Sequence, residues 1–314
     1  MVVFVVMVVA GAVLAPLQRS RRLLRVGTMG VAYIVVELTA LVALGLVWLA
    51  RRAYPDEWWE ETNRRLVAWA LRAMLGAGKR CVGFVVAVEE PPLASPLDRR
   101  GPVLVLARHG GLGDSFAVVW MLADSYRRVP RVVLKDVLQW EPLLDIALNR
   151  LGACFIGAPR PGGEDPAQRI GRLAAELGER DALLLFPEGA NWTPRRRRRA
   201  IDRLRSDGHH KAADAAVLME HVLAPRPAGV LACLEARPDL PVAVVAHTGL
   251  DTLTTAGQAW NAVPFIRPMS LRWWPAPAPP LDEAGRLSWL SAEWAVVDEW
   301  IDLRRQSVAA HRSG

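Results

Sequence analysis

Short apolar runs separated by helical patterns recur through the last two thirds of the chain. Five of these runs are typical of strands that are buried on both faces of a sheet: Val103–Ala107, Arg131–Lys135, Ala153–Gly157, Ala182–Phe186 and Val242–His247. Segments with helical periodicity lie near 115–128, 141–150, 165–179 and 208–224. Strands that alternate with helices predict an α/β fold, with a largely parallel central sheet flanked by helices.

The first fifty residues have a different pattern. An almost wholly apolar run covers 1–17, arginines follow between 19 and 25, and a second apolar run extends from about 26 to 50. The second run is long enough to cross a bilayer, which takes roughly 20 residues. We therefore expect N-terminal membrane-anchor helices over 1–55, followed by an α/β domain over 56–314. An amphipathic helix near 63–78 and a strand over 81–88 link the two.

The arginines between the two apolar runs bear on the orientation of the N-terminal helices in the membrane. The positive-inside rule places them in the cytoplasm, yet two full crossings would then put the following domain outside. Shallow insertion of both helices from one side resolves this conflict. Two buried core helices of a soluble protein are the alternative. We expect the protein at the cell membrane, with its α/β domain facing the cytoplasm.

Composition narrows the classes of partner. The chain has 314 residues, a net charge of +7 and 13 tryptophans. A basic balance is typical of proteins that bind nucleic acid, anionic lipid or acidic substrates, and the positive mean hydropathy of +0.16 favours lipid over nucleic acid. Three scattered cysteines form no metal-binding spacing and no even disulfide set, which indicates a reducing compartment and no metal site.

Polar residues follow the first strand in the stretch "RHGGLGDSF". His109 and Asp114 lie five positions apart, too far to meet on a regular helix, but the intervening glycines permit a bend that would bring them together. A carboxylate beside an imidazole fixes the tautomer and supports proton transfer. The alternative is that Asp114 only caps the following helix and His109 only ends the strand.

A second polar turn, "FPEGANWTPRRRRR", follows the strand that ends at Phe186. It contains Glu188 and then five consecutive arginines, Arg195–Arg199. Arginine suits phosphate because its planar fork binds two oxygens at once. A solvated loop, or one that touches anionic lipid headgroups, would explain the arginines equally well.

"HGGLGD" followed about 75 residues later by "FPEG" resembles the HX4D and third blocks of the PlsC-type glycerolipid acyltransferases, the lysophosphatidic acid acyltransferase family. The similarity runs from about 80 to 250. "VVLKDVLQWEPLLDIALNRLGACFIG" resembles the family's segment between these blocks, and "LPVAVVAH" resembles its fourth block.

The resemblance implies a membrane-bound O-acyltransferase of phospholipid biosynthesis. It would move an acyl group from acyl-CoA or acyl carrier protein to a hydroxyl of a lysophospholipid such as 1-acylglycerol-3-phosphate. His109 would be the general base and Asp114 would orient it, with no bound cofactor. Oxyanion stabilisation would come from backbone N–H groups of the glycine turn or from Lys135. The substrate-binding residues would be Gly110, Gly111, Gly113, Lys135, Arg160, Phe186, Pro187, Glu188, Gly189, Asn191 and Arg195.

Two departures weaken the identity of the acceptor. The family usually has an arginine at the position of Asn191, and another at the position of Ala158. Both normally help to hold the acceptor's phosphate. Arg160 and Arg195–Arg199 could take over this task. Alternatively, the same chemistry acts on a different lipid or alcohol.

Two other classes of protein remain open. "GDSF" resembles the nucleophile block of GDSL-type serine esterases, with Ser115 attacking, and 207–210 is the only loose match to the required Asp-x-x-His block. A non-catalytic, membrane-anchored lipid-binding protein would keep the anchor and the arginines but would leave the His109 and Asp114 spacing as an accident.

Overall fold

A computed structural model describes residues 1–13, 18–89, 95–111, 113–135, 140–156, 164–251, 253 and 255–313. In this part of the chain, seven strands form one sheet in the order β1-β7-β6-β2-β5-β3-β4. Neighbouring strands are parallel, except that β6 and β7 are antiparallel. The predicted α/β fold with a largely parallel sheet is confirmed. The strands are β1 (Val86–Val88), β2 (Val103–Ala107), β3 (Val129–Lys135), β4 (Cys154–Ile156), β5 (Asp181–Leu185), β6 (Val242–Thr248) and β7 (Met269–Pro275).

The central strands β2, β5 and β6 are buried over their whole length, which explains their continuous apolar sequences. Side chains of β2 alternate between two hydrophobic cores, because Val103 and Val105 belong to one core while Leu104 and Leu106 belong to the other. This is the two-residue period of a strand. The sheet is therefore the wall between the two cores.

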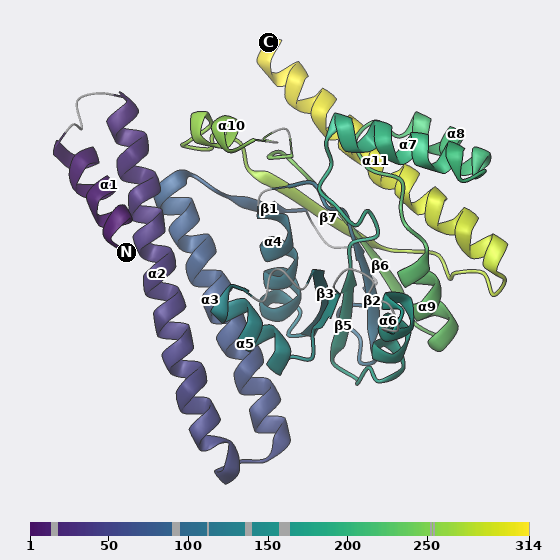
Figure 1. Cartoon of the computed structure of the whole chain (residues 1–314), viewed down its shortest axis with the longest axis horizontal. Helices are drawn as coiled ribbons and strands as arrows, with labels where there is room; N and C mark the ends of the chain where they lie inside the picture. The colour runs from purple at the N-terminus through teal and green to yellow at the C-terminus, as the bar shows by residue number, and fades with distance from the viewer. Residues whose placement is uncertain are drawn as a thin grey trace.

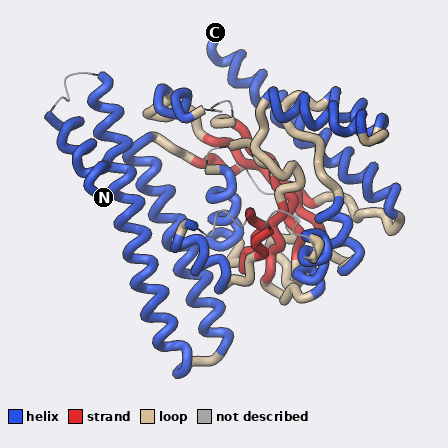
Figure 2. The backbone as a smooth tube through the Cα atoms, viewed as in Figure 1, coloured by secondary structure: helices blue, strands red, loops and turns tan. Residues whose placement is uncertain are grey.

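Helices cover both faces of the sheet (Figure 1), and Figure 2 shows the strands enclosed between them. The helices α3, α4 and α5 supply Leu71, Val118 and Leu148 to one core, whereas α6, α9 and α11 supply residues such as Trp294 to the other. The helix bounds are α3 (Asp56–Val82), α4 (Asp114–Trp120), α5 (Pro142–Arg150), α6 (Pro166–Ala175), α7 (Pro194–Ser206), α8 (His210–Leu218), α9 (Ala228–Ala236), α10 (Ala256–Asn261) and α11 (Glu283–Ser313).

Some element boundaries differ from the sequence prediction. The strand expected from residue 81 is wrong at its start, because Cys81 and Val82 end α3 and β1 has only three residues. The arginine run, interpreted as part of a polar turn, forms the first turns of α7. Thr193 caps this helix by accepting a hydrogen bond from the backbone N–H of Arg196.

The sequence prediction lacks β7 and α9. In β7 the buried Met269, Leu271 and Trp273 alternate with less buried residues, but the run is short and is followed by a proline-rich segment, and the sequence prediction did not include it. The helix expected over 208–224 ends already at Leu218. Short elements with weak periodicity are fixed by their neighbours in the sheet rather than by their own sequence.

Two N-terminal helices, α1 (Val2–Val13) and α2 (Gln18–Ala50), pack against each other along one side of the molecule (Figure 1). Glycines permit the close contact: a Cβ at Gly27 would lie 2.9 Å from Met7, and one at Gly30 would overlap the ring of Phe4. Small residues at such a contact let helix backbones approach closely.

In the described part of the chain, one helix, Arg21–Ala53, is long and apolar enough to cross a membrane, and an apolar stretch of 18 residues within it has a mean hydropathy of 2.2. Its two sides differ. Ala40 and Leu44 are 1% exposed and face the domain, whereas one stripe of apolar side chains at three- and four-residue spacing is 54–69% exposed. The stripe consists of Val35, Leu38, Val42, Leu46 and Leu49.

Candidate active site

The two polar turns predicted from the sequence meet the end of β6 at one edge of the sheet. β2 is paired with β5 on one side and β6 on the other, all three parallel, so their carboxyl ends lie together. In open α/β sheets, ligands usually bind at this edge. His109 follows β2, Phe186 follows β5, and His247 lies near the end of β6.

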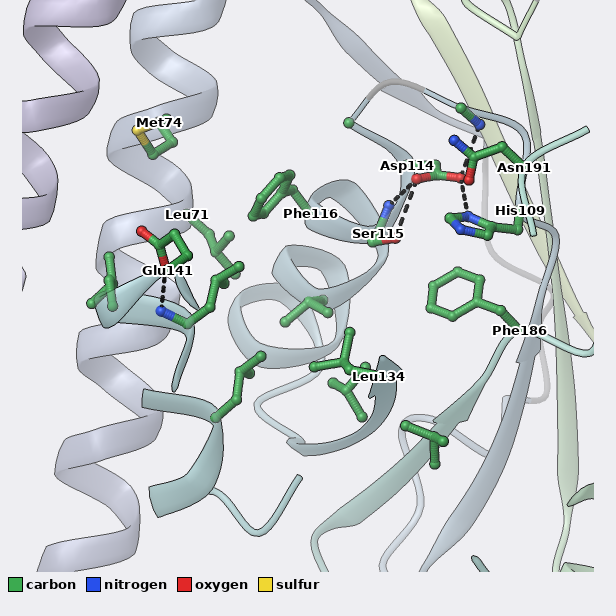
Figure 3. A pocket seen from close by; sticks show the side chains of 18 of the residues that line it. Leu71, Met74, His109, Asp114, Ser115, Phe116, Leu134, Glu141, Phe186 and Asn191 are labelled. Atoms are coloured by element: carbon green, nitrogen blue, oxygen red, sulfur yellow. Dashed lines mark hydrogen bonds and ion pairs between the residues drawn. The ribbon is translucent and has the colours of Figure 1, made fainter. Parts of the chain in front are cut away.

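His109 and Asp114 form a direct pair, as the sequence predicted. His109 Nδ1 lies 2.9 Å from Asp114 Oδ2, and Figure 3 shows the two side chains pointing toward each other. The chain bends between them at Gly111 and Gly113, with φ of 153° and 78°. The bond to Nδ1 leaves Nε2 as the ring nitrogen that can take a proton from a substrate.

Asp114 is 3% exposed, and both of its carboxylate oxygens accept hydrogen bonds. Oδ2 also accepts from the backbone N–H of Gly111 at 3.1 Å, and Oδ1 accepts from the backbone N–H of Ser115 at 2.6 Å. Burial on its own would raise the pKa of Asp114, but the hydrogen bond to His109 and the charges of His247 and His109 outweigh it and lower the pKa to about 2. The group therefore stays ionised at neutral pH and can stabilise a protonated His109.

The alternative in which Asp114 only caps a helix is wrong. Gly113, in the left-handed region, is the N-cap of α4, and Asp114 is the first helical residue. A Cβ at Gly113 would also lie 2.9 Å from the ring of Phe84. Both the backbone conformation and the space therefore require glycine here.

Glu188 holds the backbone of the catalytic turn. Its carboxylate is 1% exposed, and it accepts hydrogen bonds from the backbone N–H groups of His109, at 3.0 Å, and Leu223, at 2.9 Å. Burial raises its pKa to about 7. Trp192 fixes the other side of His109 by donating its backbone N–H to the His109 carbonyl at 3.0 Å.

A buried ionic layer lies beneath this turn, and the sequence analysis missed it. Arg108 is fully buried and donates to the carbonyl of His247 at 2.7 Å and to Asp251 at 2.9 Å. Arg305 of α11 donates to the same carboxylate at 2.6 Å. Burial would raise the pKa of Asp251, but Arg108 and Arg305 hold it well below its usual range. The one available signal was an arginine directly after a fully apolar strand.

His247 is buried within this layer and has a structural role there. Its Nε2 lies 3.0 Å from the carbonyl oxygen of Arg108 and 3.6 Å from Asp114 Oδ2. Burial lowers the pKa of His247, although the charge of Asp114 acts to raise it. The ring is therefore neutral and donates from Nε2. A Cβ at Gly110 would lie 2.8 Å from this ring, which explains the glycine at that position.

A large cavity opens from the His109 and Asp114 pair, with a volume of about 1530 Å³. Its polar end contains Asn191 and Phe186 beside His109, whereas Met74 and Glu141 lie toward the other end (Figure 3). Apolar side chains from α2, α3, α5 and α6 form most of the remaining wall. We call this cavity the chamber.

The structure brings many of the predicted substrate-binding residues to the chamber. Its lining includes Gly111, Gly113, Phe186, Pro187, Gly189 and Asn191. Gly110, Glu188 and Arg195 do not line it, whereas Arg196 and Arg226 do. The side chain of Lys135 and the whole of Arg160 lie outside the described residues.

Ser115 has no histidine as a hydrogen-bond partner among the described residues. Its hydroxyl donates to Asp114 Oδ1 at 3.2 Å. Asp207, His209 and His210 lie in the exposed connection between α7 and α8. This geometry gives Ser115 no base and disfavours the serine esterase alternative.

Comparisons with known proteins indicate which family and which fold the chain resembles. Residues 92–245 match the family model described as Acyltransferase. The structure is similar to the crystal structure of the 1-acyl-sn-glycerophosphate (LPA) acyltransferase PlsC from Thermotoga maritima. The TM-score is 0.54, the sequence identity is 15%, and the match covers 90% of this chain and 98% of that chain. No curated protein matches the chain at a significant level.

The first prediction concerns Glu188. Gln at this position does not titrate, so Glu188→Gln should remove the pH dependence that Glu188 gives to the free energy of unfolding, and the variant should lose more stability relative to the wild type at pH 5 than at pH 8. Because the folded pKa of about 7 exceeds the ordinary value of 4.5, the stability that Glu188 contributes is present below pH 4.5 and is lost as the pH rises through 7. The cost of the substitution should therefore be smaller at pH 8.

Denaturant unfolding followed by tryptophan fluorescence at both pH values measures this difference. Glu235→Gln, an exposed position on α9, is the matched control and should change little. An equal cost at pH 5 and pH 8 would contradict the assigned environment of Glu188.

Proposed function

We propose, from the match of residues 92–245 to the Acyltransferase family model, that the protein transfers a fatty acyl group to a lipid hydroxyl. The proposed donor is acyl-CoA or acyl carrier protein. The proposed acceptor is a lysophospholipid such as 1-acylglycerol-3-phosphate. A different lipid or alcohol, acylated by the same chemistry, is the second candidate, because the family's arginine is absent at Asn191.

One observation carries the proposal: an ionised, buried carboxylate holds His109 Nδ1 at 2.9 Å at the polar end of a chamber with mostly apolar walls. A base oriented in this way can remove a proton from a hydroxyl group. The adjoining apolar space suits a long acyl chain, since its volume exceeds the roughly 300–1,000 Å³ of ordinary small-molecule pockets. The proposed base and the proposed site for the acyl chain therefore adjoin each other.

The proposed reaction is direct transfer. His109 Nε2 takes the proton of the acceptor hydroxyl while the oxygen attacks the thioester carbonyl carbon. The tetrahedral intermediate then breaks its C–S bond, and the leaving thiolate receives the proton from His109. Asp114 stabilises the charged imidazole between these steps. No covalent bond to the protein forms, so Ser115 needs no role as a nucleophile.

We propose that the N-terminal helices enter one leaflet without crossing it. α2 is bonded to the domain along its length, because Arg25 donates to the carbonyl of Cys81 at 3.0 Å and Arg150 donates to that of Leu44 at 2.8 Å. A crossing would draw charged residues of α3 into hydrocarbon, which is costly. The exposed apolar stripe of α2 suits contact with acyl chains at the surface of a membrane.

This proposal keeps residues 1–55 as the membrane-contacting unit and residues 56–314 as the catalytic unit. Shallow insertion also leaves the catalytic unit on the side from which the chain enters the membrane. We place that side in the cytoplasm, where acyl thioesters of coenzyme A are available and free cysteines stay reduced.

The catalytic pair generates the second prediction. His109→Ala and Asp114→Asn should each lower the transfer rate by roughly 10²–10⁴-fold, because general base catalysis contributes about that much. Ser115→Ala should keep near-normal activity. The measurement is the release of free thiol from acyl-CoA by the purified protein with an acceptor present. Loss of activity in Ser115→Ala together with full activity in His109→Ala would sink the proposal.

The third prediction concerns the α2 stripe. Leu38→Asp and Val42→Asp should each weaken binding to phospholipid vesicles about tenfold or more, since each removes roughly 1.5–3 kcal/mol of apolar burial. Leu218→Asp, at an exposed apolar position on α8, is the matched control and should bind as the wild type does. Vesicle cosedimentation measures this, and unchanged binding of both α2 variants would contradict shallow insertion.

The fourth prediction addresses the acceptor. With labelled acyl-CoA or acyl carrier protein as donor, the purified protein should acylate at least one lysophospholipid, and His109→Ala serves as the blank. Transfer only to other alcohols would remove the lysophospholipid assignment and support the second candidate. Absence of transfer to every hydroxyl tested, with either donor, would count against acyl transfer itself.

A further inference from the structure

Two arginines line the polar end of the chamber, one from the run Arg195–Arg199 and one that belongs to no sequence motif. They are Arg196, in the first turn of α7, and Arg226, just before α9. Both arginines are exposed, so their side chains can contact a molecule that binds in the chamber. Within the described residues, neither guanidinium has a carboxylate at ion-pair distance. The chamber therefore has two uncompensated cations at the same end as His109.

Both arginines contact the loop that fixes His109. Arg226 donates its backbone N–H to the carbonyl of Pro187 at 2.8 Å, and a Cβ at Gly189 would lie 3.3 Å from its guanidinium carbon. Arg196 donates from Nη1 to the carbonyl of Asn191 at 3.1 Å. The same loop holds His109 through Glu188 and Trp192. The cations and the base are thus positioned by one short segment.

We propose that Arg196 and Arg226 bind the phosphate group of the acceptor, in place of the arginine that is missing at Asn191. This rests on the proposed function. One guanidinium group can bind two phosphate oxygens at once, and it keeps its positive charge at every physiological pH. Asn191 itself lines the chamber, and its carbonyl is the group that Arg196 contacts. Arg196, five residues after Asn191, therefore supplies the positive charge that Asn191 lacks.

Phosphate could also belong to the donor, since coenzyme A and the arm of a carrier protein contain it. Geometry favours the acceptor. The attacking hydroxyl and the phosphate of a glycerol phosphate lie on the same three-carbon unit, so a hydroxyl at His109 Nε2 puts its phosphate beside the loop over 187–193. The donor's phosphates are separated from its thioester by a long pantetheine arm.

The test compares two acceptors that differ only in phosphate, 1-acylglycerol-3-phosphate and 1-acylglycerol. For the phosphorylated acceptor, Arg196→Gln and Arg226→Gln should each lower kcat/KM about tenfold to a hundredfold, mainly through KM. The neutral acceptor should be little affected, and the KM of the acyl donor should not change. Arg205→Gln, on the exposed side of the same helix, is the matched control and should behave as the wild type does.

A binding measurement makes the result independent of turnover. Calorimetry with the His109→Ala protein should detect 1-acylglycerol-3-phosphate, and adding Arg196→Gln and Arg226→Gln should abolish that binding while 1-acylglycerol binds as before. Equal losses for both acceptors, a rise in the donor's KM alone, or undiminished binding by the double variant would each overturn the assignment. Acyl transfer with no preference for phosphate would overturn it too, while leaving the proposed function intact.

Discussion

The turn that carries His109 has no regular secondary structure of its own, so hydrogen bonds from buried side chains must fix its backbone. Glu188 accepts a hydrogen bond from the backbone N–H of His109. Arg108, the residue directly before His109, donates to the carbonyl of His247 near the end of β6. An unpaired buried donor or acceptor costs about 1–3 kcal/mol, and a broken buried ion pair costs more. The geometry of the catalytic pair therefore depends on groups that never touch a substrate. Asp251 and Arg305 extend this dependence to the C-terminal helix.

This constraint explains how one small domain can combine a polar reaction centre with a large apolar space. Polar groups gather where β5, β2 and β6 end, and many of them are hydrogen-bonded to one another there. Apolar side chains of α2, α3, α5 and α6 form most of the remaining wall of the chamber. The helix α2 serves two purposes, because one side closes the chamber through residues such as Leu44 while the opposite side exposes the stripe that begins at Val35. A lipid substrate could thus meet the protein where its apolar surface is largest.

Much of the fold and the centre of the site could be predicted from the sequence. The central strands are continuous apolar runs, and His109 with Asp114 follows one of them across a glycine bend. The role of Glu188 was beyond prediction, since its two partners, His109 and Leu223, lie far from it in the sequence. Arg226 carried no motif at all. Its place beside Gly189 depends on where α9 packs, which local patterns cannot determine.

The central claim is that the base acts on the substrate's hydroxyl directly. The most direct measurement is intact mass spectrometry of the purified protein after incubation with acyl-CoA and no acceptor. The account predicts an unmodified protein mass, together with thiol release that begins only when a glycerolipid acceptor is added. Stoichiometric appearance of an acyl adduct that maps to Ser115, and that decays when the acceptor is added, would contradict it.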